Sequence, residues 1–265
     1  MDVCWELVVG RWELIAVTSF WEGKRALAAL AAAGTLALGL IHLAGRREAV
    51  GETPVKDDFL VRDGQTVLFL GDSITAADPG YTRLIAAFIA ARHPGRKIDY
   101  VYAGVSGNNV NDLLARLDKD VIAKKPDWVT ISIGVNDVWH AFMPKIKDHA
   151  VPLETFVVKY DELLDRIQKE TKAQIVCLTP TVIHEDLGAE ENRILEGYVE
   201  ATRKAAAKHA CRFVDLRAAF RKALAEWKGP RDEKGNALTT DGVHMNPAGN
   251  ALMAIEILKV LGFGL

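Results

Sequence analysis

This chain of 265 residues contains few cysteines and carries little net charge. Its three cysteines, Cys4, Cys177 and Cys211, are too few and too widely spaced for a disulfide framework or a zinc cluster. The 33 basic and 35 acidic side chains nearly cancel and leave a formal net charge of −2. A balance of this kind gives no electrostatic footprint for nucleic acid, so we expect no nucleic-acid partner.

Low-complexity tracts are also lacking, and 49% hydrophobic with 26% charged residues is ordinary for a globular protein. One segment differs from the rest: Ala26–Gly45 contains no Lys, Arg, Asp or Glu, and basic pairs flank it on both sides. A transmembrane helix needs about 20 apolar residues, so this run is long enough to cross a bilayer. A cleaved signal peptide, an uncleaved anchor and a buried core helix are the three interpretations of it.

Of these interpretations we favour export or anchoring, because the downstream sequence has the elements of a complete domain without this segment. We therefore expect a signal peptide or membrane anchor over residues 1–47 and a linker over 48–58. The protein is then exported or membrane-anchored, in a periplasmic or other extracytoplasmic location, and any membrane contact is made through this N-terminal segment.

Beyond residue 58, short apolar runs alternate with helical patterns. Val67–Leu70 is a continuous apolar run that ends at Gly71, as expected of a strand buried on both faces. Further strands are predicted at 98–102, 128–133, 174–178 and 212–214, with an irregular segment from the end of the third strand to Pro152. Helices are predicted at 79–93 (capped by Asp78), 110–124, 154–170, 190–209, 216–227 and 247–260 (capped by Asn246). Such alternation predicts an α/β domain over 59–265, with a parallel sheet of about five strands and helices on both faces.

Polar clusters follow three of the predicted strands, and a fourth cluster lies just before the last helix. In parallel α/β sheets the working residues lie on loops beyond the carboxyl ends of the strands. The clusters are Gly71-Asp72-Ser73-Ile74-Thr75, Ala103-Gly104-Val105-Ser106-Gly107-Asn108, Gly134-Val135-Asn136-Asp137 and Asp241-Gly242-Val243-His244. Together they supply a hydroxyl, an imidazole, a carboxylate and an amide.

These groups are the components of an acyl-transfer site. A serine hydroxyl is a poor nucleophile at neutral pH, so Ser73 needs a base, and His244 is the candidate because imidazole exchanges protons near neutrality. Asp241, three residues earlier, can hold the other ring nitrogen of His244. The oxyanion that forms on an ester carbonyl needs fixed donors, for which we propose the N–H groups of Ser73 and Gly104 and the side-chain amide of Asn136.

The four clusters resemble the conserved blocks of the SGNH hydrolases, also called the GDSL esterase/lipase family. The first block is present as Gly71-Asp72-Ser73-Ile74, with Ile in place of the usual Leu, and the last as Asp241-Gly242-Val243-His244. The resemblance spans about residues 66–255. It implies a three-layer α/β/α, flavodoxin-like fold and hydrolysis through a serine acyl-enzyme with no metal or organic cofactor. It also implies for Ser73, Gly104, Asn136 and His244 the roles argued above.

Taken singly, each of these residues also has a structural explanation. Ser73 is a possible helix cap, and Gly104 a possible turn glycine with positive φ. We interpret Asp72 and Asp137 as structural carboxylates that accept loop N–H bonds. We interpret His184-Glu185-Asp186, after the fourth strand, as a solvated loop that is also a candidate for contact with the substrate, rather than as a metal site.

The substrate is predicted to be a small ester. Trp139 and His140 follow the oxyanion asparagine and are candidates for a substrate-binding wall, although a loop covering its own small core is an equal alternative. The segment has no long hydrophobic lid, which favours short acyl groups, such as acetyl, on carbohydrate-like alcohols. Lysophospholipase or thioesterase activity with the same machinery is the enzymatic alternative. The non-enzymatic alternative is a flavodoxin-like module that binds an anion at Gly104–Gly107.

Overall fold

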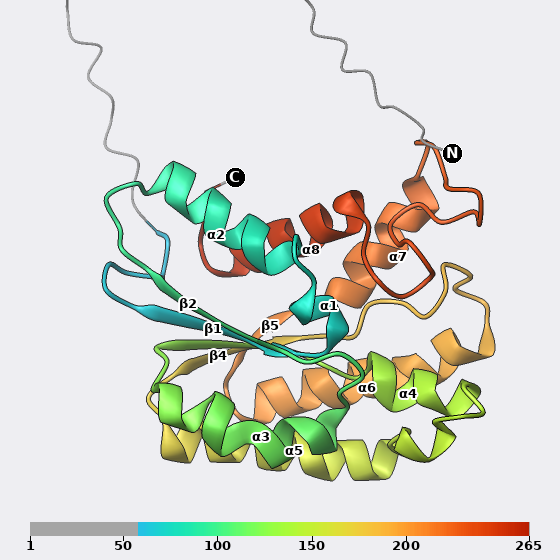
Figure 1. Cartoon of the computed structure of the whole chain (residues 1–265), viewed down its shortest axis with the longest axis horizontal. Helices are drawn as coiled ribbons and strands as arrows, with labels where there is room; N and C mark the ends of the chain where they lie inside the picture. Colours follow the sequence, from blue (N-terminus) through green and yellow to red (C-terminus); the bar gives the residue numbers. More distant parts are fainter. Residues whose placement is uncertain (1–57, 265) are drawn as a thin grey trace, which may run out of the picture. The chain divides into compact units, whose positions relative to one another are not determined.

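The sheet has five parallel strands in the order β2-β1-β3-β4-β5 (Figure 1). These elements come from a computed structural model that describes residues 58–264. The strands are β1 (Thr66–Gly71), β2 (Asp99–Gly104), β3 (Trp128–Ser132), β4 (Gln174–Leu178) and β5 (Arg212–Val214). The predicted parallel sheet of five strands is confirmed.

Helices cover both faces of the sheet and complete the expected three layers (Figure 1). One face carries α2 (Tyr81–Arg92), α7 (Leu216–Glu226) and α8 (Pro247–Val260), and α8 contacts the other two. The opposite face carries α3 (Val110–Asp120), α5 (Leu153–Glu170) and α6 (Glu190–Lys208), and α5 packs against both neighbours. The three-layer α/β/α fold is therefore confirmed.

The centre of the sheet is formed by apolar strands that are buried on both faces. Leu68, Phe69 and Leu70 of β1 are fully buried, as are Val129 and Ile131 of β3. In the parallel register, the last residue of β1 pairs with the last residue of β2 and with the last residue of β3. The carboxyl ends of these three strands therefore meet at one edge, and the loops that follow them begin side by side.

The start of α2 differs from the prediction. Asp78 does not cap this helix and Pro79 is not its first residue: Gly80 is the N-cap and the helix begins at Tyr81. The Tyr81 N–H donates to Oδ1 of Asn250 in α8 at 2.8 Å. A partner so distant in the sequence satisfies the first helical N–H, and no local pattern reveals it.

Short helices occupy segments that the sequence left irregular. They are α1 (Ser73–Ala76), α4 (Val135–Trp139) and the 3₁₀ turns η2 (His140–Phe142) and η3 (Lys147–His149). The predicted helix over 110–124 also divides, since α3 ends at Asp120 and a 3₁₀ turn, η1 (Ile122–Lys124), follows it. By contrast, α8 begins at Pro247 as predicted, and Asn246 Oδ1 accepts from the N–H groups of Ala248 and Gly249.

The predicted signal peptide or anchor over 1–47 lies outside the described residues, as does the linker apart from Asp58. Within residues 58–264, no helix is both long enough and apolar enough to cross a membrane.

Candidate active site

Ser73, His244 and Asp241 form one continuous chain of hydrogen bonds. Nε2 of His244 lies 2.8 Å from Oγ of Ser73, and Nδ1 of the same ring lies 2.7 Å from Oδ2 of Asp241. The serine and the histidine are 171 residues apart in the sequence. The fold thus brings together the three side chains that the sequence singled out as nucleophile, base and orienting carboxylate.

Ser73 is positioned by the short helix α1, of which it is the first residue. Asp72 is the N-cap: its Oδ1 accepts from the Ile74 N–H at 2.9 Å, and its side chain is buried. Burial raises the pKa of Asp72 to about 6, even though the hydrogen bond from Ile74 acts in the opposite direction. Because Ser73 stands at the start of a helix, its N–H belongs to the first turn, whose donors have no intrahelical acceptor.

Asp241 holds both ends of the turn that carries His244. Its Oδ1 accepts from the N–H groups of Val243 (3.0 Å) and His244 (2.8 Å), and its Oδ2 holds the ring. Partial burial acts to raise the pKa of Asp241, but the hydrogen bonds from His244 and Val243 outweigh it and hold this pKa below its ordinary value. A carboxylate that stays ionised favours an imidazolium beside it.

Gly104 and Asn136 lie at the same sheet edge as Ser73. Gly104 ends β2, and a Cβ on it would stand 2.3 Å from the backbone nitrogen of Ala76, so only glycine lets α1 pack so closely. A turn with positive φ is not the reason for this glycine. Asn136, buried in α4, donates through Nδ2 to the Asn108 carbonyl at 2.9 Å, which ties it to the loop that follows Gly104.

Asp137 has the structural role expected of it. Its Oδ1 accepts from the Val110 N–H, the first residue of α3, at 3.0 Å, whereas its Oδ2 is buried without a hydrogen-bond partner. Burial raises the pKa of Asp137 to about 7, and the nearby charge of Asp72 adds to the rise. Two carboxyl groups with raised pKa values thus lie beneath the site.

The two candidates for a substrate-binding wall, Trp139 and His140, lie in different environments. Trp139 is half-buried and its ring meets that of His244 edge-on, with centroids 6.3 Å apart. His140 is only 5% exposed, and its ring packs edge-on against His149. The geometry therefore favours Trp139 as a wall of the site and leaves His140 little surface for a substrate.

Glu185 lies in a different environment from the one that the sequence predicts. Its neighbours His184 and Asp186 are exposed as expected of a solvated loop. The Glu185 side chain is only 5% exposed, and its carboxylate accepts from the N–H groups of Ala237, Leu238 and Thr239 and from Oγ1 of Thr239. Thr239 Oγ1 accepts in turn from the Gly242 N–H at 3.2 Å. Glu185 therefore anchors the loop that carries Asp241 and His244.

Arg116 of α3 is a second residue that the sequence did not reveal. Its Nη2 donates to the carbonyls of Gly71 (2.8 Å) and Ala103 (2.9 Å), and its Nε donates to Oδ1 of Asn108 (2.7 Å). One guanidinium thus joins the ends of β1 and β2 to the loop beneath Asn136. A planar group with five donors is suited to this bridging.

Within residues 58–264, no cluster of three or more His, Cys, Asp or Glu side chains has the arrangement of a metal site. The side chains that meet at Ser73 are those of nucleophilic acyl transfer: a hydroxyl, a base within hydrogen-bond distance of it and a carboxylate that orients the base.

Comparison with known proteins gives the same picture. The GDSL-like lipase/acylhydrolase family matches residues 69–252. An acetylxylan esterase of Geobacillus stearothermophilus is 34% identical over 221 residues, which cover 77% of this chain and 96% of that protein. A GDSL esterase/lipase of Oryza sativa, WDL1, is 26% identical over 179 residues, which cover 63% of this chain and 66% of that protein.

Solved structures are similar over the same part of the chain. A crystal structure of the Geobacillus acetylxylan esterase superposes with a TM-score of 0.70 at 33% identity, covering 77% of this chain and 97% of that one. An alpha/beta hydrolase from the metagenome of Lake Arreo, Spain, has a TM-score of 0.70 at 32% identity and covers 77% and 98%. Catalytic mutants of the Geobacillus esterase replace a serine, a histidine or an aspartate by alanine, and the aspartate lies three positions before the histidine.

Proposed function

This chain belongs to the GDSL-like lipase/acylhydrolase family and hydrolyses ester bonds, and we propose that its substrates are acetyl or other short acyl esters of carbohydrate-like alcohols. The hydrogen-bonded chain from Asp241 through His244 to Ser73 carries the chemical part of this proposal. Acetyl specificity is supported by the acetylxylan esterase that this chain resembles over nearly that protein's whole length.

In the proposed mechanism Ser73 is the nucleophile and His244 the base. His244 Nε2 takes the proton of Ser73 as Oγ bonds to the acyl carbon, and the carbonyl electron pair moves to oxygen. His244 then gives this proton to the departing alcohol oxygen, the C–O bond breaks, and an acyl-Ser73 ester remains. A water then attacks the acyl carbon as His244 takes its proton. His244 gives this proton to Ser73 Oγ as the acyl C–O bond breaks, which releases the acid and restores the Ser73 hydroxyl. Asp241 orients the ring and stabilises its charged form.

The oxyanion of both steps is assigned to the Ser73 N–H, the Gly104 N–H and the Asn136 amide. Asn136 uses one amide hydrogen on the Asn108 carbonyl, which fixes the group and leaves its second hydrogen for the oxyanion. The three-position spacing of Asp241 and His244 matches that of the aspartate and the histidine replaced in catalytic mutants of the Geobacillus esterase, which supports the triad roles of these two residues. The scheme needs no metal or organic cofactor.

A substrate panel tests the proposal. Acetylated xylo-oligosaccharides, lysophospholipids, acyl thioesters and a series of nitrophenyl esters are compared by kcat/KM, with Ser73→Ala as the inactive control. We expect the acetylated sugars to be the best natural substrates and the nitrophenyl series to peak at the shortest chains. A preference for acyl chains of more than about eight carbons, or for lysophospholipids or thioesters, contradicts it.

We also propose that residues 1–47 export or anchor the enzyme, so that it meets its substrate outside the cytoplasm. The uncharged run Ala26–Gly45 between basic pairs supports this. Fractionation of the native cells tests it, and enzyme that stays in the cytoplasm contradicts it.

A further inference from the structure

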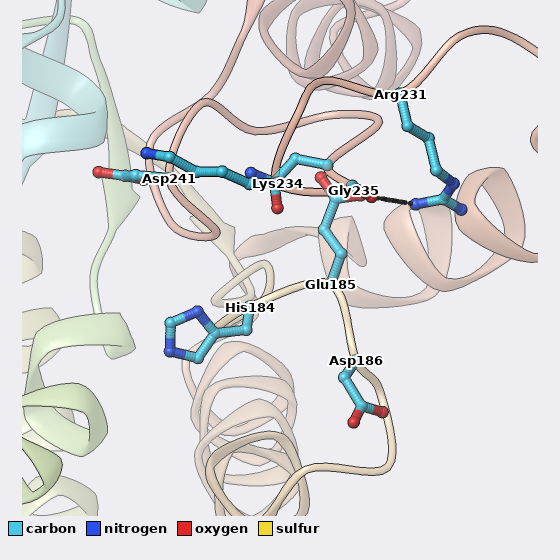
Figure 2. Close-up of a pocket in the computed structure, with 8 residues that line it drawn as sticks. His184, Glu185, Asp186, Arg231, Lys234, Gly235 and Asp241 are labelled. Atoms are coloured by element: carbon cyan, nitrogen blue, oxygen red, sulfur yellow. Dashed lines mark hydrogen bonds and ion pairs between the residues drawn. The ribbon is translucent and has the colours of Figure 1, made fainter.

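A cavity of about 470 Å³ lies beside Asp241. Asp241 is the last member of the hydrogen-bonded chain that begins at Ser73 and passes through His244. Figure 2 shows the two walls of the cavity: His184, Glu185 and Asp186 come from the loop after β4, and Arg231, Lys234 and Gly235 from the loop before His244. Its volume is in the range of small-molecule sites, which is about 300–1,000 Å³.

Seven of the eight lining residues have polar or charged side chains, which favours a polar occupant over a long acyl chain. Arg231 and Lys234 bring donors, whereas Asp186 and Asp241 bring acceptors. A ligand that meets both kinds of group must itself donate and accept, and the hydroxyls of a sugar do so.

The walls are held in place before any ligand arrives. Glu185 accepts four hydrogen bonds from Ala237, Leu238 and Thr239, and Arg231 Nη1 donates to the Gly235 carbonyl at 2.8 Å (Figure 2). The Glu185 carboxylate and part of the Arg231 guanidinium are therefore engaged in hydrogen bonds that hold the two loops. The exposed ends of Lys234 and Asp186 remain for a ligand, because Lys234 has no ion pair in residues 58–264 and Asp186 uses Oδ1 on the Gly188 N–H.

His184 brings the cavity wall against the catalytic turn. It has φ +56°, a conformation that few residues other than glycine adopt and that is often found at functional sites. Its ring lies so near Gly242 that a Cβ there would stand 2.5 Å from Nδ1. Gly242 follows Asp241, so the wall and the triad share one turn.

We propose that this cavity binds the sugar unit next to the acetylated one and thereby selects oligosaccharides over simple acetyl esters. The inference rests on the proposed carbohydrate esterase activity. Asp241 is both a member of the triad and a wall of the cavity, so one imidazole ring and two hydrogen bonds separate the cavity from the Ser73 oxygen. A ligand that spans from Ser73 into the cavity must therefore be longer than one acetylated sugar.

The test is the ratio of kcat/KM for acetylated xylotriose to that for acetylated methyl xyloside. We measure it for the wild type, for the double variant Lys234→Ala with Asp186→Asn, and for Lys222→Ala on the exposed face of α7 as control. Asn at 186 keeps the oxygen that accepts from Gly188. We expect the double variant to lose about tenfold in this ratio, the size of one hydrogen bond to a charged group. Its activity on nitrophenyl acetate stays within about twofold of the wild type.

Three outcomes overturn the inference. In the first, the wild type cleaves both sugars but does not prefer xylotriose; in the second, the double variant keeps the wild-type preference. In the third, the double variant loses activity on nitrophenyl acetate to the same extent as on xylotriose. A wild type that cleaves nitrophenyl acetate but no acetylated sugar instead defeats the proposed function itself, so the two failures are distinguishable.

Discussion

At the scale of single residues, Asn136 is the donor whose contribution is easiest to isolate. It is buried and fixed by its bond to the Asn108 carbonyl, so its amide needs no reorganisation when charge develops on the substrate. We expect Asn136→Ala to lower kcat by about 10²–10³ with the fold intact, the size found when one oxyanion donor is removed.

The measurement is kcat on nitrophenyl acetate together with the thermal unfolding midpoint. Asn111→Ala, an exposed asparagine on α3, is the matched control and should keep the wild-type rate. A near-normal rate in Asn136→Ala removes Asn136 from the mechanism.

Asp241 provides the second prediction at this scale. In Asp241→Asn the side-chain oxygen still accepts from the backbone N–H groups of Val243 and His244, so the turn is kept. The amide then faces Nδ1 of His244 as a donor, which favours the wrong tautomer and no longer stabilises the imidazolium.

We expect kcat in Asp241→Asn to fall by about 10²–10⁴ while circular dichroism and the unfolding midpoint stay close to wild type. The lowered pKa of Asp241 means that this carboxylate stays ionised below its ordinary titration range, so its own protonation does not cause a loss of activity near neutral pH. A wild-type rate that is flat down to pH 4 excludes His244 as the base.

At the scale of elements, the loop over 237–244 determines whether the triad assembles. Its backbone is held by Glu185, a residue 52 to 54 positions earlier. In Glu185→Gln one carboxylate oxygen is replaced by an NH₂ group. This group is a donor and faces a donor of the loop, so at least one of these hydrogen bonds is lost and the two donors repel each other.

We expect Glu185→Gln to lower the free energy of unfolding by about 1–3 kcal/mol and to lower kcat more than it changes KM. Urea unfolding and steady-state kinetics measure the two effects. Glu233→Gln, at an exposed position shortly before this loop, is the control and should behave as wild type. If Glu185→Gln loses neither stability nor kcat, Glu185 does not anchor the loop.

The elements also show why some local predictions held and others did not. β4 and β5 end where the sequence places them, because the apolar residues of each strand are followed by a polar residue, which is a purely local signal. The predicted start of α2 was wrong because the N–H of its first residue donates to Asn250, which is 169 residues away. The prediction for Glu185 failed for the same reason. The sequence shows that this residue is polar, but it does not show that its hydrogen-bond partners lie 52 to 54 positions later.

At the scale of the whole molecule, the candidate site could be predicted because three of its four polar clusters follow strands and parallel strands end at one edge. Ser73, Gly104 and Asn136 are carried by neighbouring strands, so topology alone brings them together. The cavity beside Asp241 could not be predicted in this way, since two irregular loops form it and no periodic pattern determines their path.

The pH dependence of stability is a further property of the whole molecule, and Asp137 carries a measurable part of it. Burial raises its pKa from an ordinary value of 3.8 to about 7 in the folded chain. Between these values the folded state binds more protons than the unfolded state, so the contribution of Asp137 to the free energy of unfolding falls as the pH rises from about 4 to about 7. The asparagine side chain does not titrate, so Asp137→Asn lacks this part of the decrease in the free energy of unfolding.

We therefore expect the stability of Asp137→Asn relative to wild type to rise across this window, by on the order of 1–4 kcal/mol, and to be constant above it. Urea unfolding at several pH values between 4.5 and 8 measures this difference, and Asp148→Asn, an exposed carboxyl in η3, is the control that should parallel the wild type. Asn keeps the oxygen that accepts from the Val110 N–H, so the loss of the titrating carboxyl is the main change. Parallel pH profiles for wild type and Asp137→Asn would mean that this carboxyl titrates alike in the folded and unfolded chains, and its burial beneath the site would then carry no electrostatic cost.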